Sequence, residues 1–157
     1  MASWSKVMAD APELAARVQR VFDAHRHKTM ATLRSDGSPR ISGTEAQFRD
    51  GELWIGSMPE AHKARDLRRD PRIALHSATV DPDMADGDAK VAGRAVEITD
   101  DATLEGMRSD EQPPGPYHLF RIDVTEMVLM TVAGDPPDHM VIESWHEGRG
   151  VQRVERR

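Results

Sequence analysis

One short stretch of the chain combines a hydroxyl, a histidine and a lysine in a pattern that suits an anion. The sequence GSMPEAHKARDLRRDP begins at Gly56 and places Ser57, His62 and Lys63 just before or early in a predicted helix, Pro59–Arg69. The N-terminus of a helix presents unpaired backbone N–H groups and the positive end of the helix dipole, so anions bind there readily. The spacing therefore predicts a phosphate site.

The same stretch is also compatible with a solvated helix face. Arg65 and Arg69 lie about one helical turn apart and could extend the basic patch. In a purely structural interpretation, Asp66 and Asp70 pair with Arg69 and Lys63. The residue pattern alone leaves both interpretations open.

Other chemistry receives less support from the sequence. The seven histidines are scattered apart from His25 and His27, so no metal site is expected. The chain has no cysteine, which excludes disulfides, thiolate zinc sites, iron–sulfur clusters and cysteine nucleophiles. Glu45 is a candidate general acid or base, although such a residue more often faces solvent or pairs with an arginine. No G-x-S-x-G, Walker or paired-carboxylate motif is present, so the catalytic residues stay unknown.

Length and charge limit the class of protein. The 157 residues correspond to one domain, 1–157, and no apolar run approaches the roughly 20 residues of a membrane span. The N-terminus lacks the pattern of a secretory signal, so a cytoplasmic protein with no membrane partner is expected. A net charge of −6 argues against nucleic acid as a partner. A local basic patch on an acidic chain favours a small anionic ligand over a polymer.

The predicted elements are mostly strands joined by turns. Three helices are expected, at Pro12–His25, Pro59–Arg69 and Thr99–Arg108. The expected strands are Lys28–Arg34, Arg40–Phe48, Leu53–Gly56, Arg72–Thr79, Lys90–Ile98, Tyr117–Val132, which has room for one bent strand or two, and Met140–Trp145. This order predicts a mainly β (α+β) fold with a closed or nearly closed antiparallel barrel.

Three further features lie within, between or after these elements. Gly93 interrupts its strand, where a bulge or a close backbone approach is expected. Residues 80–89 form an acidic loop rich in turn formers, and residues 149–157 are interpreted as a basic tail.

The order of these motifs resembles the pyridoxamine 5'-phosphate oxidase-like split-barrel proteins. The hairpin with DGSPR, the DGELW strand, GS, the helix KARDLRRDPRIAL and the strand with AGRAVEI carry the resemblance over about Arg26–Ile98. It implies an antiparallel split β-barrel of the FMN-binding type. It further implies FMN or, as in many actinobacterial members, a deazaflavin as cofactor, and a homodimer with the cofactor at the interface. The interface is expected in the region Tyr117–Trp145 and the early strands.

The resemblance also assigns site residues. It implies that the Ser57 hydroxyl and the Lys63 cation hold the phosphate, with His62 where many members have arginine. Asp66 stands where asparagine is common, which places a like charge near the anion. Trp145 is expected either to cover the cofactor ring or to lie in the core, and the strand 40–42 is expected to edge the ring. The expected cofactor-binding set is Arg40, Ile41, Ser42, Gly56, Ser57, His62, Lys63, Arg65 and Trp145.

The function implied is that of an FMN-binding oxidoreductase passing hydride to or from an unknown small substrate. FMN is preferred over deazaflavin because the wider family is defined by it. A true pyridoxamine phosphate oxidase is not expected, because GVQRVERR lacks a recognisable second phosphate site. The alternatives are a deazaflavin-dependent reductase, a non-catalytic flavin- or haem-binding protein, and an acidic interaction protein whose helix Lys63–Arg72 contacts a polyanion.

Overall fold

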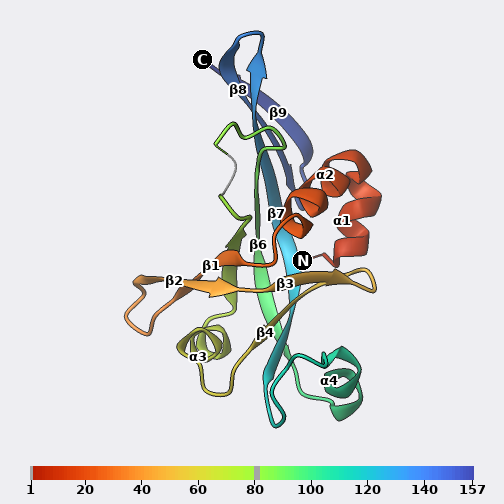
Figure 1. Cartoon of the computed structure of the whole chain (residues 1–157), viewed down its shortest axis with the longest axis vertical. Coiled ribbons are helices and arrows are strands. Elements are labelled where there is room, and N and C mark those ends of the chain that lie inside the picture. Colours follow the sequence, from red (N-terminus) through yellow and green to blue (C-terminus); the bar gives the residue numbers. More distant parts are fainter. Residues whose placement is uncertain (1, 80–81) are drawn as a thin grey trace.

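Antiparallel strands make up most of the computed structural model, which describes residues 2–79 and 82–157 (Figure 1). The strands are β1 Lys28–Leu33, β2 Pro39–Thr44, β3 Ala46–Arg49, β4 Glu52–Ser57, β5 Arg72–His76, β6 Asp88–Ile98, β7 His118–Gly134, β8 Pro137–His146 and β9 Gly150–Arg156. The helices are α1 Trp4–Asp10, α2 Pro12–Asp23, α3 His62–Arg69 and α4 Asp101–Met107. Residues 80 and 81 of the predicted acidic loop lie outside the described residues. The prediction of a mainly β fold with short helices is confirmed.

The long strand β7 organises the sheet by changing its partner along one edge. The order of the main path is β2-β1-β5-β6-β7-β4-β3, and every pairing is antiparallel. One edge of β7 pairs with β6 over most of its length, while the other pairs first with β4 and then, from Glu126, with β8. The predicted strand Arg40–Phe48 is interrupted at Glu45, which separates β2 from β3. The sheet is not closed, so of the closed or nearly closed barrel that the sequence predicts, the fully closed form is not the one found.

The two N-terminal helices cover the sheet beside β7 (Figure 1). The apolar face of α2 is buried as its spacing predicts, through Leu14, Ala15, Val18, Val21 and Phe22. Helix α1, which the sequence analysis missed, buries Trp4 and stacks it 4.5 Å from the Phe48 ring. None of the described helices is long and apolar enough to cross a membrane.

Gly93 provides the expected irregularity in β6. The register with β7 shifts between Ala92 and Gly93, so that Ala92 faces Glu126 while Gly93 faces Val124. A Cβ on Gly93 would lie 2.0 Å from the Asp123 carbonyl oxygen, which no side chain allows. The prediction of a bulge and a close backbone approach is confirmed.

Residues 150–156 form a strand, so the interpretation as a basic tail is wrong. β9 pairs antiparallel with β8, with Val151 opposite Trp145 and Val154 opposite Ile142. The turn before it uses Gly148 and Gly150, both at positive φ. The hairpin of β8 and β9 extends beyond the helices along the long axis (Figure 1). All of β9 is exposed, so its charged residues masked the strand pattern.

Candidate functional site

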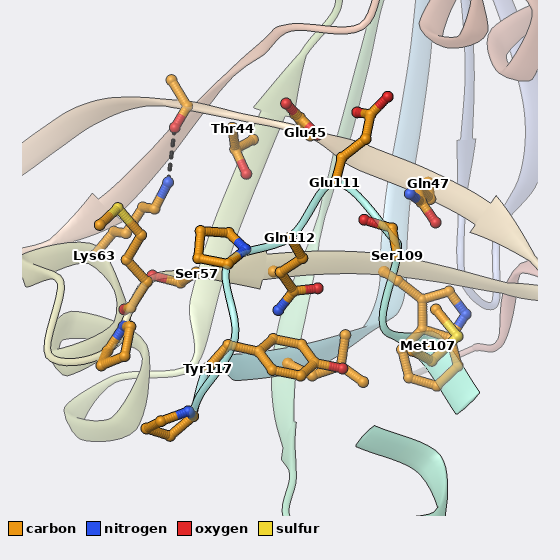
Figure 2. Close-up of a pocket in the computed structure, with 18 of the residues that line it drawn as sticks. Thr44, Glu45, Gln47, Ser57, Lys63, Met107, Ser109, Glu111, Gln112 and Tyr117 are labelled. Atoms are coloured by element: carbon orange, nitrogen blue, oxygen red, sulfur yellow. Dashed lines mark hydrogen bonds between the residues drawn. The ribbon is translucent and has the colours of Figure 1, made fainter. Parts of the chain in front are cut away.

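A cavity of about 550 Å³ lies where β4 ends and α3 begins (Figure 2). Its walls are formed by the junction of β2 and β3, the end of β4, the last residue of α4 and the loop that follows it, residues 107–117. Lys63 lies at one end and Met107 at the other. The volume falls within the range of about 300–1,000 Å³ that is typical of small-molecule sites.

Three of the predicted site residues line this cavity, namely Gly56, Ser57 and Lys63. Helix α3 begins at His62 rather than at Pro59, so Ser57 ends β4 and does not directly precede the helix. The Ser57 side chain is buried, and its hydroxyl donates to the Met58 carbonyl over 3.2 Å. No side chain caps the start of α3. Ser57 and Lys63 thus line the same cavity, each with its side chain hydrogen-bonded to a backbone carbonyl.

Lys63 presents a positive charge to the cavity. Its Nζ donates to the Gly43 carbonyl oxygen over 2.8 Å, the bond drawn as a dashed line in Figure 2. Burial lowers the pKa of the half-buried Lys63 ammonium, and the negative charge of Glu45 partly opposes that shift. No carboxylate among the described residues forms an ion pair with Lys63. An ammonium has three donors, so two remain for a ligand.

The neighbouring arginines, by contrast, are all paired with acids. The pairs are Arg65–Glu60 at 3.2 Å, Arg68–Glu97 at 2.8 Å, Arg69–Asp66 at 2.9 Å and Arg72–Asp70 at 2.6 Å. The predicted partner of Lys63, Asp70, therefore binds Arg72 instead. The basic stretch is largely neutralised, which weighs against its use as a polyanion-binding face and singles out Lys63.

Arg40 is held away from this cavity by Asp66. The buried Asp66 carboxylate accepts hydrogen bonds from Arg40 Nε and Thr32 Oγ1, both over 2.7 Å, and from Arg69 over 2.9 Å. Burial alone raises the pKa of Asp66, but these donors outweigh burial and hold the pKa below its usual range. Two arginines thus compensate the like charge that was expected near the anion.

The remaining predicted residues lie outside this cavity, in three different places. Arg40, His62 and Arg65 line a separate cavity of about 350 Å³ beside the β1–β2 hairpin. Ile41 is 76% exposed and Ser42 is half-buried, and neither lines a described cavity. Trp145 is 1% exposed within the hydrophobic core and also lies outside the cavities, as the structural alternative anticipated.

The segment after α4, which the sequence analysis did not assign to the site, supplies a wall of the cavity. Tyr117 lines the cavity and donates its hydroxyl to the Leu104 carbonyl over 2.6 Å, and its pKa is raised by burial. The Arg108 guanidinium carbon lies 5.0 Å from the Tyr117 ring centroid. Arg108 also donates to the carbonyls of Pro113 and Gly115, which fixes the loop conformation.

An arginine bridges the mouth of the cavity. Arg26 binds Glu45 over 3.0 Å and Glu111 over 2.7 Å, so it joins the β2–β3 junction to the loop after α4. Glu45 therefore forms the arginine pair that was the alternative to a free general base. Among the described residues, no group of three His, Cys, Asp or Glu side chains is placed to hold a metal ion.

Comparison with known proteins identifies the fold and the family. The family model described as Pyridoxamine 5'-phosphate oxidase matches residues 14–131. No curated protein matches the sequence significantly.

Solved structures with the same fold include three that are informative. PhzG from Burkholderia lata 383, solved with tetrahydrophenazine-1-carboxylic acid, has a TM-score of 0.67 at 14% identity, covering 97% of this chain and 92% of that one. A pyridoxamine 5'-phosphate oxidase-related, FMN-binding protein from Nostoc punctiforme PCC 73102 has a TM-score of 0.65 at 14% identity, with 94% and 96% covered. An F420 reductase has a TM-score of 0.55 at 18% identity, with 69% and 94% covered.

These likenesses confirm the split β-barrel, and the family model covers most of the chain, from α2 to β7. The chain therefore belongs to the pyridoxamine 5'-phosphate oxidase family, whose split-barrel fold includes FMN-binding proteins.

Proposed function

We propose that the chain binds a flavin-type cofactor, with FMN as the first choice, in the cavity of Figure 2 and acts as an oxidoreductase on a small substrate. The observation that carries the proposal is the half-buried Lys63 ammonium, which lines the cavity and has no carboxylate partner among the described residues. A partly desolvated ammonium without an acidic partner is costly, and a bound phosphate would compensate its charge through charge-assisted hydrogen bonds.

The residues present fit such a cofactor. The cavity is large enough for a planar ring with a phosphate arm, and Ser57 lies beside Lys63 to contribute a hydroxyl. The Tyr117 ring, fixed by Arg108 and the Leu104 carbonyl, offers a flat wall. When bound, a flavin supplies hydride chemistry, and the chain supplies binding, orientation and electrostatics.

A titration with FMN, followed by absorbance and fluorescence, tests the proposal. Lys63→Ala is expected to weaken FMN binding by about 1–3 kcal/mol, because a charge-assisted contact is lost. Riboflavin has no phosphate, so Lys63→Ala is expected to change the affinity for riboflavin little. Lys90→Ala, which removes an exposed lysine on β6, is the matched control and should bind as wild type does. Equal FMN affinity of Lys63→Ala and wild type would remove Lys63 from the site.

A parallel titration with a deazaflavin separates the two cofactor candidates, since an F420 reductase shares the fold. Tighter binding of the deazaflavin would replace FMN as the assignment. Reduction of the bound cofactor by an electron donor, and its reoxidation by an acceptor, would support an oxidoreductase. A bound cofactor that exchanges no electrons would support a carrier or sensor instead.

We also propose that the chain forms a homodimer, as the resemblance implies. Support comes from exposed apolar side chains in the two expected regions. Ile41 and Met58 are both 76% exposed near the early strands, and Val132 is 39% exposed on β7. Light scattering coupled to size-exclusion chromatography measures the mass directly, and a monomer at micromolar concentration would contradict the proposal.

A further inference from the structure

A buried hydroxyl without a partner lines the candidate cofactor cavity. Thr44, at the end of β2, is 5% exposed, and its Oγ1 has no hydrogen-bond partner among the described residues. An unsatisfied buried hydroxyl is rare in folded proteins and costs free energy. Its missing partner therefore needs an explanation.

Thr44 lies among the groups already assigned to the cavity. It follows Gly43, whose carbonyl oxygen binds Lys63 Nζ over 2.8 Å. Figure 2 shows the Thr44 side chain between Lys63 and Glu45, on the wall above Ser57. Across the ladder it faces Lys28, whose Nζ donates to the Arg26 carbonyl over 3.2 Å. Thr44 lines the open cavity, so the cavity is the side from which a ligand would approach its hydroxyl.

The other buried polar atoms without partners have different surroundings. Within residues 2–79 and 82–157 they are Glu52 Oε2 and His146 Nδ1, and neither residue lines the cavity. Glu52 lies in the field of Arg121, and His146 contacts Glu126 through its other ring nitrogen over 2.9 Å. Of these three residues, Thr44 alone lines a space that a ligand could fill.

We propose that Thr44 is a further cofactor-binding residue, whose hydroxyl donates a hydrogen bond to an acceptor oxygen of the bound flavin. This inference rests on the proposed function and adds a third polar group to Lys63 and Ser57. The acceptor oxygen belongs either to the phosphate or to the ring and its ribityl chain. Both offer the same chemistry to a hydroxyl donor.

The proposal predicts effects of opposite sign on the cofactor-free protein and on cofactor binding. Thr44→Val keeps the shape and removes the hydroxyl, so the cofactor-free protein should melt about 2–4 °C higher, because a buried unsatisfied group is lost. The same variant should bind FMN about 3- to 30-fold more weakly, because a hydrogen bond to the ligand is lost. Thr44→Ser, which keeps the hydroxyl, should bind close to wild type.

Two threonines serve as matched controls. Thr32 is as buried as Thr44, but its hydroxyl binds Asp66 over 2.7 Å, so Thr32→Val should lower the melting temperature of the cofactor-free protein. Thr29 is exposed on β1, and Thr29→Val should change neither stability nor binding. Opposite changes in melting temperature for Thr32→Val and Thr44→Val would distinguish a hydroxyl that has a partner in the folded protein from one whose partner is a ligand.

Comparison of FMN with riboflavin locates the acceptor. An equal loss of affinity for both ligands on Thr44→Val places it on the ring or ribityl chain, and a loss for FMN alone places it on the phosphate. If wild type binds FMN and Thr44→Val binds it equally well, this inference is overturned while the proposed function stands. If wild type binds neither FMN nor a deazaflavin, the proposed function fails and this inference fails with it.

Discussion

Arg40 Nε lies 2.7 Å from the buried Oδ2 of Asp66, which ties strand β2 to helix α3. The same carboxylate accepts from Thr32 on β1 and from Arg69 at the end of α3. One side chain thus fixes the helix that carries Lys63 against two strands. The family resemblance implied that Arg40 edges the cofactor ring, but its guanidinium is already engaged in this link.

Removing the Asp66 carboxylate should therefore cost stability. Asp66→Ala leaves the Arg40 guanidinium and the buried Thr32 hydroxyl without their acceptor, which predicts a loss of about 3 kcal/mol in the free energy of unfolding. Urea denaturation followed by circular dichroism measures the change. Asp66→Asn, which keeps an acceptor oxygen, should lose less. An Asp66→Ala variant as stable as wild type would show that the link contributes nothing.

Stability should fall in acid because the pKa of folded Asp66 lies below its ordinary 3.8. The stabilisation by this carboxylate is complete above the unfolded pKa and is lost as the pH falls through the folded value. Glu97, bound by Arg68, acts with the same sign, as does Asp70, whose pKa Arg72 lowers to about 2. Melting temperatures between pH 6 and pH 2, about the window that these pKa values set, should decrease, and Asp66→Asn should flatten the curve.

Gly93→Ala should be among the most destabilising single-methyl changes in the sheet. Its Cβ would meet the Asp123 backbone oxygen at 2.0 Å, so β6 and β7 would have to separate at the bulge. We expect a loss of about 3 kcal/mol or more, or failure to fold. Gly106→Ala is the control, because a Cβ there would meet no atom within 4 Å beyond its chain neighbours and its own helix backbone, and alanine favours the helix α4 by about 0.5–1 kcal/mol. Similar effects at both positions would contradict the close approach.

Substitution of Trp145 should change the stability of the protein and leave the spectrum of a bound flavin unchanged. The side chain is buried in the core and lies opposite Met127, outside the cavity, so truncation should cost about 3–5 kcal/mol. Trp145→Phe retains much of the packing and should fold well enough for a flavin titration. We expect its flavin absorbance and fluorescence to match wild type. A shifted flavin spectrum would bring Trp145 back to the ring.

Local signals in the sequence determined much of the fold. The apolar spacing of α2, the short helix expected at Thr99–Arg108 and the glycine at the β6 bulge all rest on neighbouring residues, and all three are found in the structure. Ser57 and Lys63 line the same cavity, and only five residues lie between them in the sequence. The strand β9 was missed because its exposed charges obscure the period of a half-buried strand.

Only the tertiary structure decided which basic side chains form ion pairs with acids and which do not. Arg65, Arg68 and Lys63 look alike in a basic run, and their partners come from the turn before α3, from β6 and from β2. Likewise, the local sequence does not show that the Thr44 hydroxyl lacks a hydrogen-bond partner, because this depends on which groups surround it in the folded chain. Pairing and desolvation depend on contacts between distant segments, so the residue pattern predicts a site and the fold selects its members.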